Sequence, residues 1–174
     1  MLSVKNLSIS FNSNNELNTV VNSISFELKE QQILGIVGES GSGKSVTSLA
    51  VLGLLSSNSK VSGKIIFNKK DLTRLSETEF RKIRGNYISM IFQEPMSSLN
   101  PSLTCGFQVQ EILLQHAIIS KVNAKKEVIN LFNKVKLPRA ETIFNQYPHQ
   151  ISGGQKQRVM IAMAIACKPQ ILIA

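Results

Sequence analysis

The stretch Gly38-Glu39-Ser40-Gly41-Ser42-Gly43-Lys44-Ser45 decides the fold class, because it fits the pattern G-x-x-x-x-G-K-[ST]. The apolar run 33–37 before it predicts a buried parallel strand, and residues 46–55 after it predict a helix. A strand that leads through a glycine-rich loop into a helix is the context in which this pattern binds phosphate. The sequence therefore predicts a phosphate-binding loop at 38–45.

The residue types of this loop suit a bound nucleotide. Its glycines allow consecutive N–H groups to point inward at phosphate oxygens, and the helix N-terminus adds partial positive charge. Lys44 is expected to reach the β- and γ-phosphates, and the hydroxyl of Ser45 to ligate Mg²⁺. The expected nucleotide contacts of this segment are Gly38, Ser40, Gly41, Ser42, Gly43, Lys44, Ser45 and Val46. Such a loop alone also fits GTPases and adenylate-type kinases.

Composition sets broad limits on the fold and the partners. A chain of 174 residues with 43% hydrophobic residues can bury one sizeable core, so we expect a single domain. Twenty Lys and Arg against 11 Asp and Glu give a net charge of +9, which favours anionic partners such as nucleotides, acidic lipid surfaces or nucleic acid. The charges are scattered in small groups without interleaved aromatics, which favours solvated faces over a nucleic-acid patch.

The sequence contains no membrane-spanning or secretory signal pattern. No run of about 18 apolar residues occurs, and the N-terminus lacks a basic segment followed by an apolar one. We therefore expect a cytosolic chain. Cys105 and Cys167 have no C-x-x-C spacing and are expected to be reduced, structural thiols.

The first half of the chain predicts strands around the phosphate loop. Alternating apolar residues over 2–11 and 20–28 predict an antiparallel pair joined by an exposed Asn/Ser-rich loop at 12–18. Residues 64–67 predict a further strand, 76–84 a short helix with a capping-box start, and 87–92 a buried strand.

The second half predicts a helical region followed by one more strand. Residues 95–148 contain two helical faces at i, i+3, i+4, i+7 spacing. Residues 153–167 predict a helix with another such face, and 170–174 a buried strand. The residues of the three faces are Val109, Ile112, Leu113 and His116; Val128, Leu131, Phe132 and Val135; and Val159, Ala162, Met163 and Ala166.

A second motif narrows the class. The run Ile151-Ser152-Gly153-Gly154-Gln155 resembles the signature sequence of ATP-binding-cassette (ABC) proteins, with Ile151 where Leu is commoner. Ser152 and two glycines at a helix start present a hydroxyl, N–H groups and the helix dipole to an anion. In the family that anion is the γ-phosphate bound by a second cassette, so the resemblance implies that Ser152, Gly153, Gly154 and Gln155 contact nucleotide across a dimer.

Two further positions match the family. Gln93, at the end of the predicted strand 87–92, resembles the Q-loop glutamine, which implies coordination of Mg²⁺ and sensing of the γ-phosphate during catalysis. Phe11 resembles the aromatic residue that stacks on adenine, although an alternating strand also needs core aromatics. His149 is expected at most near the site, and His116 is expected to be structural.

The resemblance extends to one branch of the family. Residues 35–47, 90–101 and 147–150 look like the ATP-binding subunits of dipeptide, oligopeptide and nickel importers. This likeness implies an α/β P-loop cassette over 1–174: a β subdomain with the P-loop core at 1–94, a helical subdomain at 95–152, and the signature helix with a core strand at 153–174.

The same resemblance implies cofactors, partners and location. It implies ATP and Mg²⁺, a second identical or different cassette, two transmembrane permease subunits and an external solute-binding protein, with no nucleic acid. The subunit would lie peripherally on the cytoplasmic face of the inner membrane. The solute would be peptide-like, or nickel.

In the family, a strand such as 170–174 is followed by an Asp that holds Mg²⁺ and a Glu that polarises water. The 174 residues of this chain do not include this Asp or this Glu. We therefore expect the 174 residues alone to bind nucleotide weakly, hydrolyse ATP poorly and have low solubility. Two alternatives stay open: a truncated, non-catalytic nucleotide-binding remnant, and a soluble ABC ATPase that acts on nucleic acid, although 95–148 is short for a coiled coil.

Overall fold

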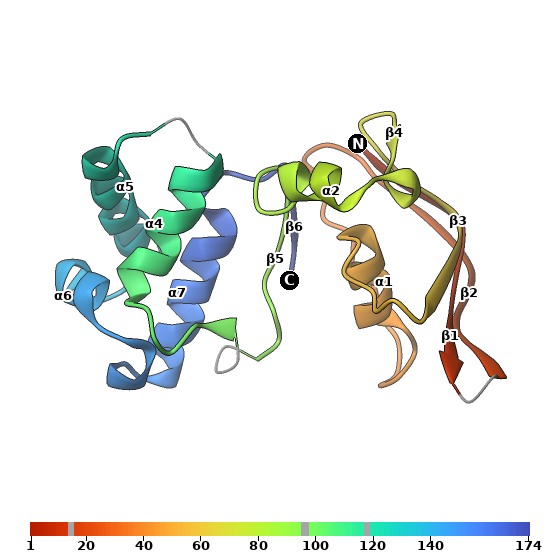
Figure 1. Cartoon of the computed structure of the whole chain (residues 1–174), viewed down its shortest axis with the longest axis horizontal. Coiled ribbons are helices and arrows are strands. Elements are labelled where there is room, and N and C mark those ends of the chain that lie inside the picture. The colour runs from red at the N-terminus through yellow and green to blue at the C-terminus, as the bar shows by residue number, and fades with distance from the viewer. Residues whose placement is uncertain (14–15, 95–97, 117–118) are drawn as a thin grey trace. The chain divides into compact units, whose positions relative to one another are not determined.

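The chain divides into two compact units, residues 1–81 and 82–174 (Figure 1). The structure is a computed structural model that describes residues 1–13, 16–94, 98–116 and 119–174. The predicted helical region begins at Pro95, which lies outside the described residues, as do 96–97 and 117–118.

An antiparallel sheet forms the centre of the first unit. Its strands are β1 (Leu2–Ser13), β2 (Glu16–Leu28), β3 (Ser59–Phe67) and the short β4 (Lys70–Asp71), in the order β2-β1-β3-β4. The predicted antiparallel pair is confirmed, with Leu2 opposite Leu28 and Phe11 opposite Asn18. The strands are longer than predicted: Asn12 pairs with Leu17 and Ser13 with Glu16, so most of the expected loop 12–18 belongs to the ladder.

Apolar residues of this sheet make the core of the first unit. Alternate residues of β1 are buried until a register shift between Val4 and Leu7, where Asn6 has a φ of 47° and its N–H donates to Ser25 Oγ at 2.8 Å. The bulge puts Leu7 and then Ile9 back on the buried face. The buried residues of the sheet and its following turn are Leu2, Val4, Leu7, Ile9, Val21, Ile65, Phe67 and Leu72.

Three short helices begin in the first unit. They are α1 (Lys44–Val51), the 3₁₀ turn η1 (Leu72–Arg74) and α2 (Glu77–Ile83). The predicted helices at 46–55 and 76–84 are both present, but the first begins two residues earlier, because the phosphate loop leads directly into it, and ends four residues earlier, at Val51. At the start of α2, the Ser76 N–H donates to Glu79 Oε2 at 3.0 Å, as the capping-box pattern predicts.

The prediction of a buried strand at 33–37 is wrong. Residues 33–37 have no regular structure, and Ile33 and Val37 are 97% and 93% exposed. A buried strand needs ladder hydrogen bonds to a neighbour, and no described strand pairs with this segment. The apolar run has the composition of a strand, but composition does not provide the partner.

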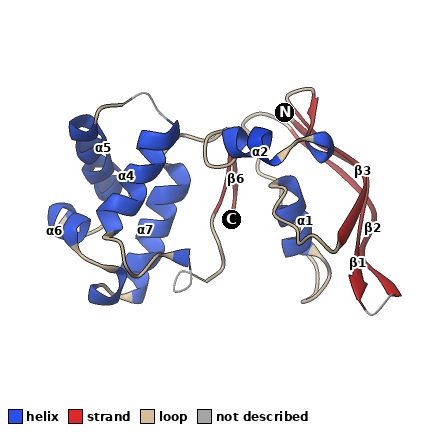
Figure 2. Cartoon of the chain, viewed as in Figure 1, coloured by secondary structure: helices blue, strands red, loops and turns tan. Residues whose placement is uncertain are grey.

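The second unit packs helices beside a parallel strand pair. The strands β5 (Ile88–Met90) and β6 (Ile171–Ile173) pair in parallel, with Ile88 opposite Ile171 (Figure 2). Both agree with the predicted strands at 87–92 and 170–174, shortened at their ends. The helices are α4 (Cys105–His116), α5 (Lys121–Lys134), α6 (Ala140–Asn145), the 3₁₀ turn η2 (Pro148–Gln150) and α7 (Gly153–Ile165).

The predicted helical faces form the core of this unit. Helices α4, α5 and α7 lie side by side (Figure 1), and their apolar stripes meet in one cluster. Its fully buried members include Val109, Val128, Phe132, Val159 and Ala162. Helical periodicity therefore identified most of the core residues on α4, α5 and α7, although His116 does not belong to the cluster and the cluster also includes Leu137 and Phe144 from outside the predicted faces.

Two observations concern membranes and thiols. Among the described residues, no helix has both the length and the apolar character needed to cross a membrane. Cys105 and Cys167 are both free, and burial raises the pKa of the Cys105 thiol to about 11.

Candidate functional site

The start of α1 offers unpaired N–H groups at the predicted phosphate loop. The first backbone hydrogen bond of this helix runs from the Thr47 N–H to the Gly43 carbonyl oxygen at 2.8 Å, so the N–H groups of residues 44–46 precede the ladder. Gly43 at the N-cap provides no side-chain acceptor, and the first turn contains no acidic residue. The helix end is thus open to an external anion.

Lys44 lies across the loop that precedes it. Its ammonium donates to the carbonyl oxygens of Gly38 at 2.7 Å and Glu39 at 2.6 Å, and to Ser42 Oγ at 3.3 Å. These contacts hold a positive charge over the backbone of the loop, whose residues 38–42 are exposed. A triphosphate could exchange these neutral acceptors for charged oxygens, which form the stronger hydrogen bonds with an ammonium group.

Gly43 fixes how the loop joins its helix. Its φ of +87° lies in the left-handed region, and a Cβ there would come 2.7 Å from Val21 Cγ2 and 3.1 Å from the Val20 carbonyl oxygen. Only glycine both adopts this φ without strain and leaves the space beside Val20 and Val21 free. Thr47, buried beneath the loop, adds a hydrogen bond from its hydroxyl to the Gly43 carbonyl oxygen at 2.9 Å. The loop is therefore anchored on β2 and α1 at its helical end.

The second motif forms a reciprocal cap at the start of α7. Ser152 Oγ accepts the Gln155 N–H at 3.3 Å, and Gln155 Oε1 accepts the Ser152 N–H at 2.8 Å. The Ser152 hydroxyl hydrogen is not needed for this capping box, so it can be donated to an outside acceptor.

Gly153 and Gly154 are surrounded by open space. A Cβ built at either position would meet no atom within 4 Å, and both residues are exposed. Packing within this chain therefore gives no reason for glycine at these positions. Close approach of a ligand to the backbone N–H groups would explain why both positions are glycine.

A matching turn precedes the signature. The Tyr147 N–H donates to Gln150 Oε1 at 2.8 Å, and the Gln150 N–H donates to the Tyr147 carbonyl oxygen at 2.9 Å. The rings of Tyr147 and His149 stack at 5.6 Å between centroids and 11° between planes. Two glutamines, Gln150 and Gln155, thus each fold back onto a backbone N–H three residues earlier, and together they define the path into α7.

The remaining predicted site residues are exposed or half-buried. Ser45 is exposed in the first turn of α1, and Gln93 is exposed three residues after β5. Phe11 is half-buried on β1, between Asn18 of β2 and Ser59 of β3. The phosphate loop belongs to the first unit, and Gln93 and the signature belong to the second.

Sequence reasoning missed two residues that shape these motifs. Thr47 supports the phosphate loop from below, and Gln150 orders the turn before the signature. The signal for Gln150 was available, because the spacing Tyr147 to Gln150 repeats the capping-box spacing Ser152 to Gln155. Thr47 gave no such signal, since a threonine inside a helix bonds to the preceding turn in many proteins.

The comparisons with known proteins agree on one family. The profile described as ABC transporter matches residues 21–174. The dipeptide transport ATP-binding protein DppD of Bacillus subtilis is 51% identical over 176 residues, and the oligopeptide transport ATP-binding protein OppD of Escherichia coli is 46% identical over 174 residues. In both cases all of this chain is covered, and 52% of the relative. The chain spans about half the length of these curated relatives.

A solved structure supports the fold. The ATP-binding cassette MJ0796, in a dimeric post-hydrolysis state bound to ADP and Pi, aligns with a TM-score of 0.88 at 28% identity. The alignment covers 99% of this chain and 72% of that chain. The predicted cassette fold, with its antiparallel N-terminal sheet, parallel strands and helices, is confirmed. The chain belongs to the ABC transporter family, and these two curated relatives are an oligopeptide and a dipeptide transport ATP-binding protein.

Proposed function

We propose that the protein is the ATP-binding and ATP-hydrolysing subunit that energises import of a peptide-like solute, or nickel, across the cytoplasmic membrane. The observation that carries this proposal is the presence of two separate helix starts whose geometry suits an anion, at Gly43–Val46 and Ser152–Gln155, in a chain that resembles peptide transport ATP-binding proteins over its whole length. Two cassettes that bind a nucleotide between them need both helix starts, one from each cassette.

In this proposal the first helix start holds the phosphates of ATP. The N–H groups of Gly41, Gly43 and the first turn of α1 donate to phosphate oxygens, and Lys44 turns from the Gly38 and Glu39 carbonyl oxygens to the β- and γ-phosphates. Ser40, Ser42 and Val46 line the same loop. The anchoring of Gly43 on β2 keeps these donors in place before the nucleotide arrives, which lowers the cost of reorganisation.

Mg²⁺ would be held by oxygen ligands. The first ligand that we propose is Ser45 Oγ, in the first turn of α1 directly after the phosphate-binding loop. The second is the amide oxygen of Gln93. Mg²⁺ supplies charge neutralisation on the phosphate oxygens when bound. The half-buried Phe11 offers a ring for the adenine base.

The second helix start would act on the nucleotide of a partner cassette. Ser152 donates its free hydroxyl hydrogen, and Gly153 and Gly154 allow the γ-phosphate to approach the backbone of α7. Gln155 positions Ser152 through the reciprocal cap. The similar cassette MJ0796 is a dimer when bound to ADP and Pi, which supports a second cassette as partner.

The further partners follow from the same family likeness. We propose two transmembrane permease subunits, an external solute-binding protein and a peripheral position on the cytoplasmic face of the inner membrane. The choice between peptide and nickel would then be made by those partners.

Binding of a fluorescent ATP analogue to wild type and two variants tests the proposal. Lys44→Ala should abolish binding, because the ammonium group over the loop is lost, whereas Lys60→Ala, an exposed lysine on β3, should bind like wild type. Equal binding by all three proteins would overturn the proposal. We also expect a polypeptide of these 174 residues to release phosphate from ATP very slowly, as no carboxylate in it is placed after β6 to orient water.

A further inference from the structure

The positive charge of the chain is concentrated in its second unit. Residues 82–174 contain eleven Lys and Arg and four Glu, a net charge of +7, whereas residues 1–81 contain nine basic and seven acidic residues, a net charge of +2. Within 121–139 there are six basic residues and one acidic residue. Four of them, Lys121, Lys125, Lys126 and Lys134, lie in α5, and Lys136 and Arg139 lie between α5 and α6; we name all six the α5 basic face.

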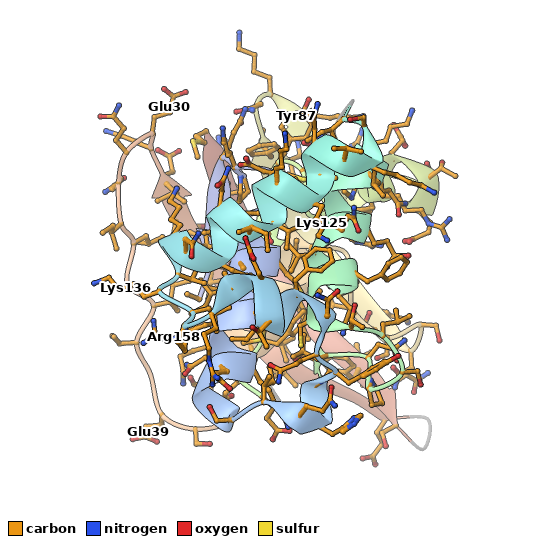
Figure 3. All side chains as sticks on the ribbon, turned by 90° about the vertical axis from the view of Figure 1, so that its left-hand side faces the viewer. Glu30, Glu39, Tyr87, Lys125, Lys136 and Arg158 are labelled. Atoms are coloured by element: carbon orange, nitrogen blue, oxygen red, sulfur yellow. The ribbon has the colours of Figure 1, made fainter. Side chains whose placement is uncertain are left out.

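Core packing turns this face toward solvent. The apolar residues of α5, Ala124, Val128, Leu131 and Phe132, are buried in the helical cluster, whereas all six basic residues are exposed. Figure 3 looks onto this side of the second unit and labels Lys125 and Lys136. The face is therefore available to a partner as a property of the fold.

The six charges are not compensated within the part of the chain that the structure describes. Ion pairs such as Lys70 with Glu79 lie in residues 1–81, whereas none of the six residues of the α5 basic face pairs with a described carboxylate. Lys125 lies over the ring of Phe144, 5.1 Å from its centroid, and the nearby Glu127 accepts a hydrogen bond from Asn130. The face remains a block of positive charge.

The charges at the N-terminal end of α5 oppose helix stability. Lys121 stands in the first turn of α5, where the helix dipole favours an acidic residue, and no acidic residue is present there. Lys121 and Lys125 are also a like-charge pair at i, i+4, which is unfavourable on a helix. Lys134 in the last turn does suit the helix dipole and Lys125 contacts Phe144, but Lys121 and Lys126 make no such contribution, and an external anion is the most direct explanation of the excess charge.

We propose that the α5 basic face binds the anionic headgroups of a lipid bilayer. Five of the six residues are lysines, which act as point charges suited to many diffuse phosphates rather than to one bidentate partner. Val122, 69% exposed between Lys121 and Lys125, gives the face an apolar side chain at the headgroup boundary. The only aromatic residue in 119–139, Phe132, is fully buried, so bases of a nucleic acid have no ring to stack on.

Co-sedimentation with vesicles tests this inference without nucleotide, so its outcome is independent of the phosphate loop. The chain should pellet with vesicles of 3:1 phosphatidylcholine and phosphatidylglycerol, pellet far less with pure phosphatidylcholine, and be released by raised salt. Lys121→Glu/Lys126→Glu should lower the partition coefficient by about 25-fold or more, because each lysine near an anionic surface contributes about fivefold. Lys5→Glu/Lys60→Glu changes the net charge equally on exposed strand positions and should keep most of the binding.

Three results would overturn the inference. They are no pelleting with anionic vesicles, equal losses in the two double variants, and binding of an RNA oligonucleotide or an acidic peptide at salt that abolishes vesicle binding. Lys121→Gln/Lys126→Gln, which only removes the charges, should lose less binding than the Glu variant. Far-ultraviolet circular dichroism of each variant checks that its helix content equals that of wild type.

Discussion

Ser152 and Gln155 hold each other at the start of α7: the Ser152 N–H donates to Gln155 Oε1 at 2.8 Å, and the Gln155 N–H donates to Ser152 Oγ at 3.3 Å. The hydroxyl that we propose to contact nucleotide is therefore oriented by the same residue that satisfies the helix end. Stability and binding geometry depend on one pair of side chains.

Gln155→Ala should destabilise the second unit by about 1 kcal/mol, since one half of the capping box is lost. Gln157→Ala, an exposed position further along α7, should stay within about 0.5 kcal/mol of wild type. Urea unfolding followed by circular dichroism measures both. Equal stability of the two variants would show that the cap contributes nothing.

Gly43→Ala should destabilise the first unit by about 2 kcal/mol or more. An alanine at this position would have to keep a φ in the left-handed region, which is unfavourable for any residue with a Cβ. Its methyl group would also come too close to Val21 and to the Val20 carbonyl oxygen. Gly35→Ala is the matched control, because a Cβ there meets no atom within 4 Å. The prediction fails if both variants unfold at the same urea concentration.

The stability that Glu79 provides should depend on pH. The backbone N–H of Ser76 donates to the Glu79 carboxylate and Lys70 lies 3.0 Å from it, which together lower the pKa of Glu79 from 4.5 to about 2. A folded-state pKa below the unfolded value means that the contribution is complete above about pH 4.5 and disappears as pH falls toward 2.

Thermal unfolding of wild type and Glu79→Gln across this range tests the point. The variant should have the lower Tm at pH 7, and the two curves should converge in acid. A Tm difference that does not change between pH 7 and about pH 2.5 would exclude the linkage.

Cys105 should be inert toward thiol reagents in the folded protein. Burial raises the pKa of its thiol to about 11, so the thiolate is scarce at pH 8 and the sulfur is inaccessible as well. Alkylation at pH 8 followed by peptide mass spectrometry should label Cys105 only after denaturant is added. Rapid labelling of Cys105 in the native state would contradict the burial.

Local and periodic features were predictable from the sequence, and features that depend on a distant partner were not. The core face of Val128, Leu131 and Phe132 followed from helical spacing, and the Ser152 cap followed from a three-residue pattern, because both are decided within one helix. The extent of β1 and β2 was misjudged since Asn12 and Ser13 have the composition of a loop, yet the ladder continues through them to Leu17 and Glu16.

The segment 33–37 is the clearest case in which composition alone gave a wrong prediction. Its apolar residues predicted a buried strand, but no described strand pairs with them. Among the candidate site residues, those of the phosphate loop and the signature have geometry suited to anions. The roles of Gln93 and Phe11 stay predictions, since side-chain position alone does not identify a ligand.

The exposed segment 33–37 leads directly into the phosphate loop, which is anchored at its helical end by Gly43 and Thr47. Ordering each backbone residue costs about 1–2 kcal/mol, so fixing this whole segment is a large entropic term. A strand that pairs with 33–37 would remove that term before nucleotide arrives. In the function that we propose, nucleotide affinity and this strand pairing would be thermodynamically coupled, and each would strengthen the other by the same factor.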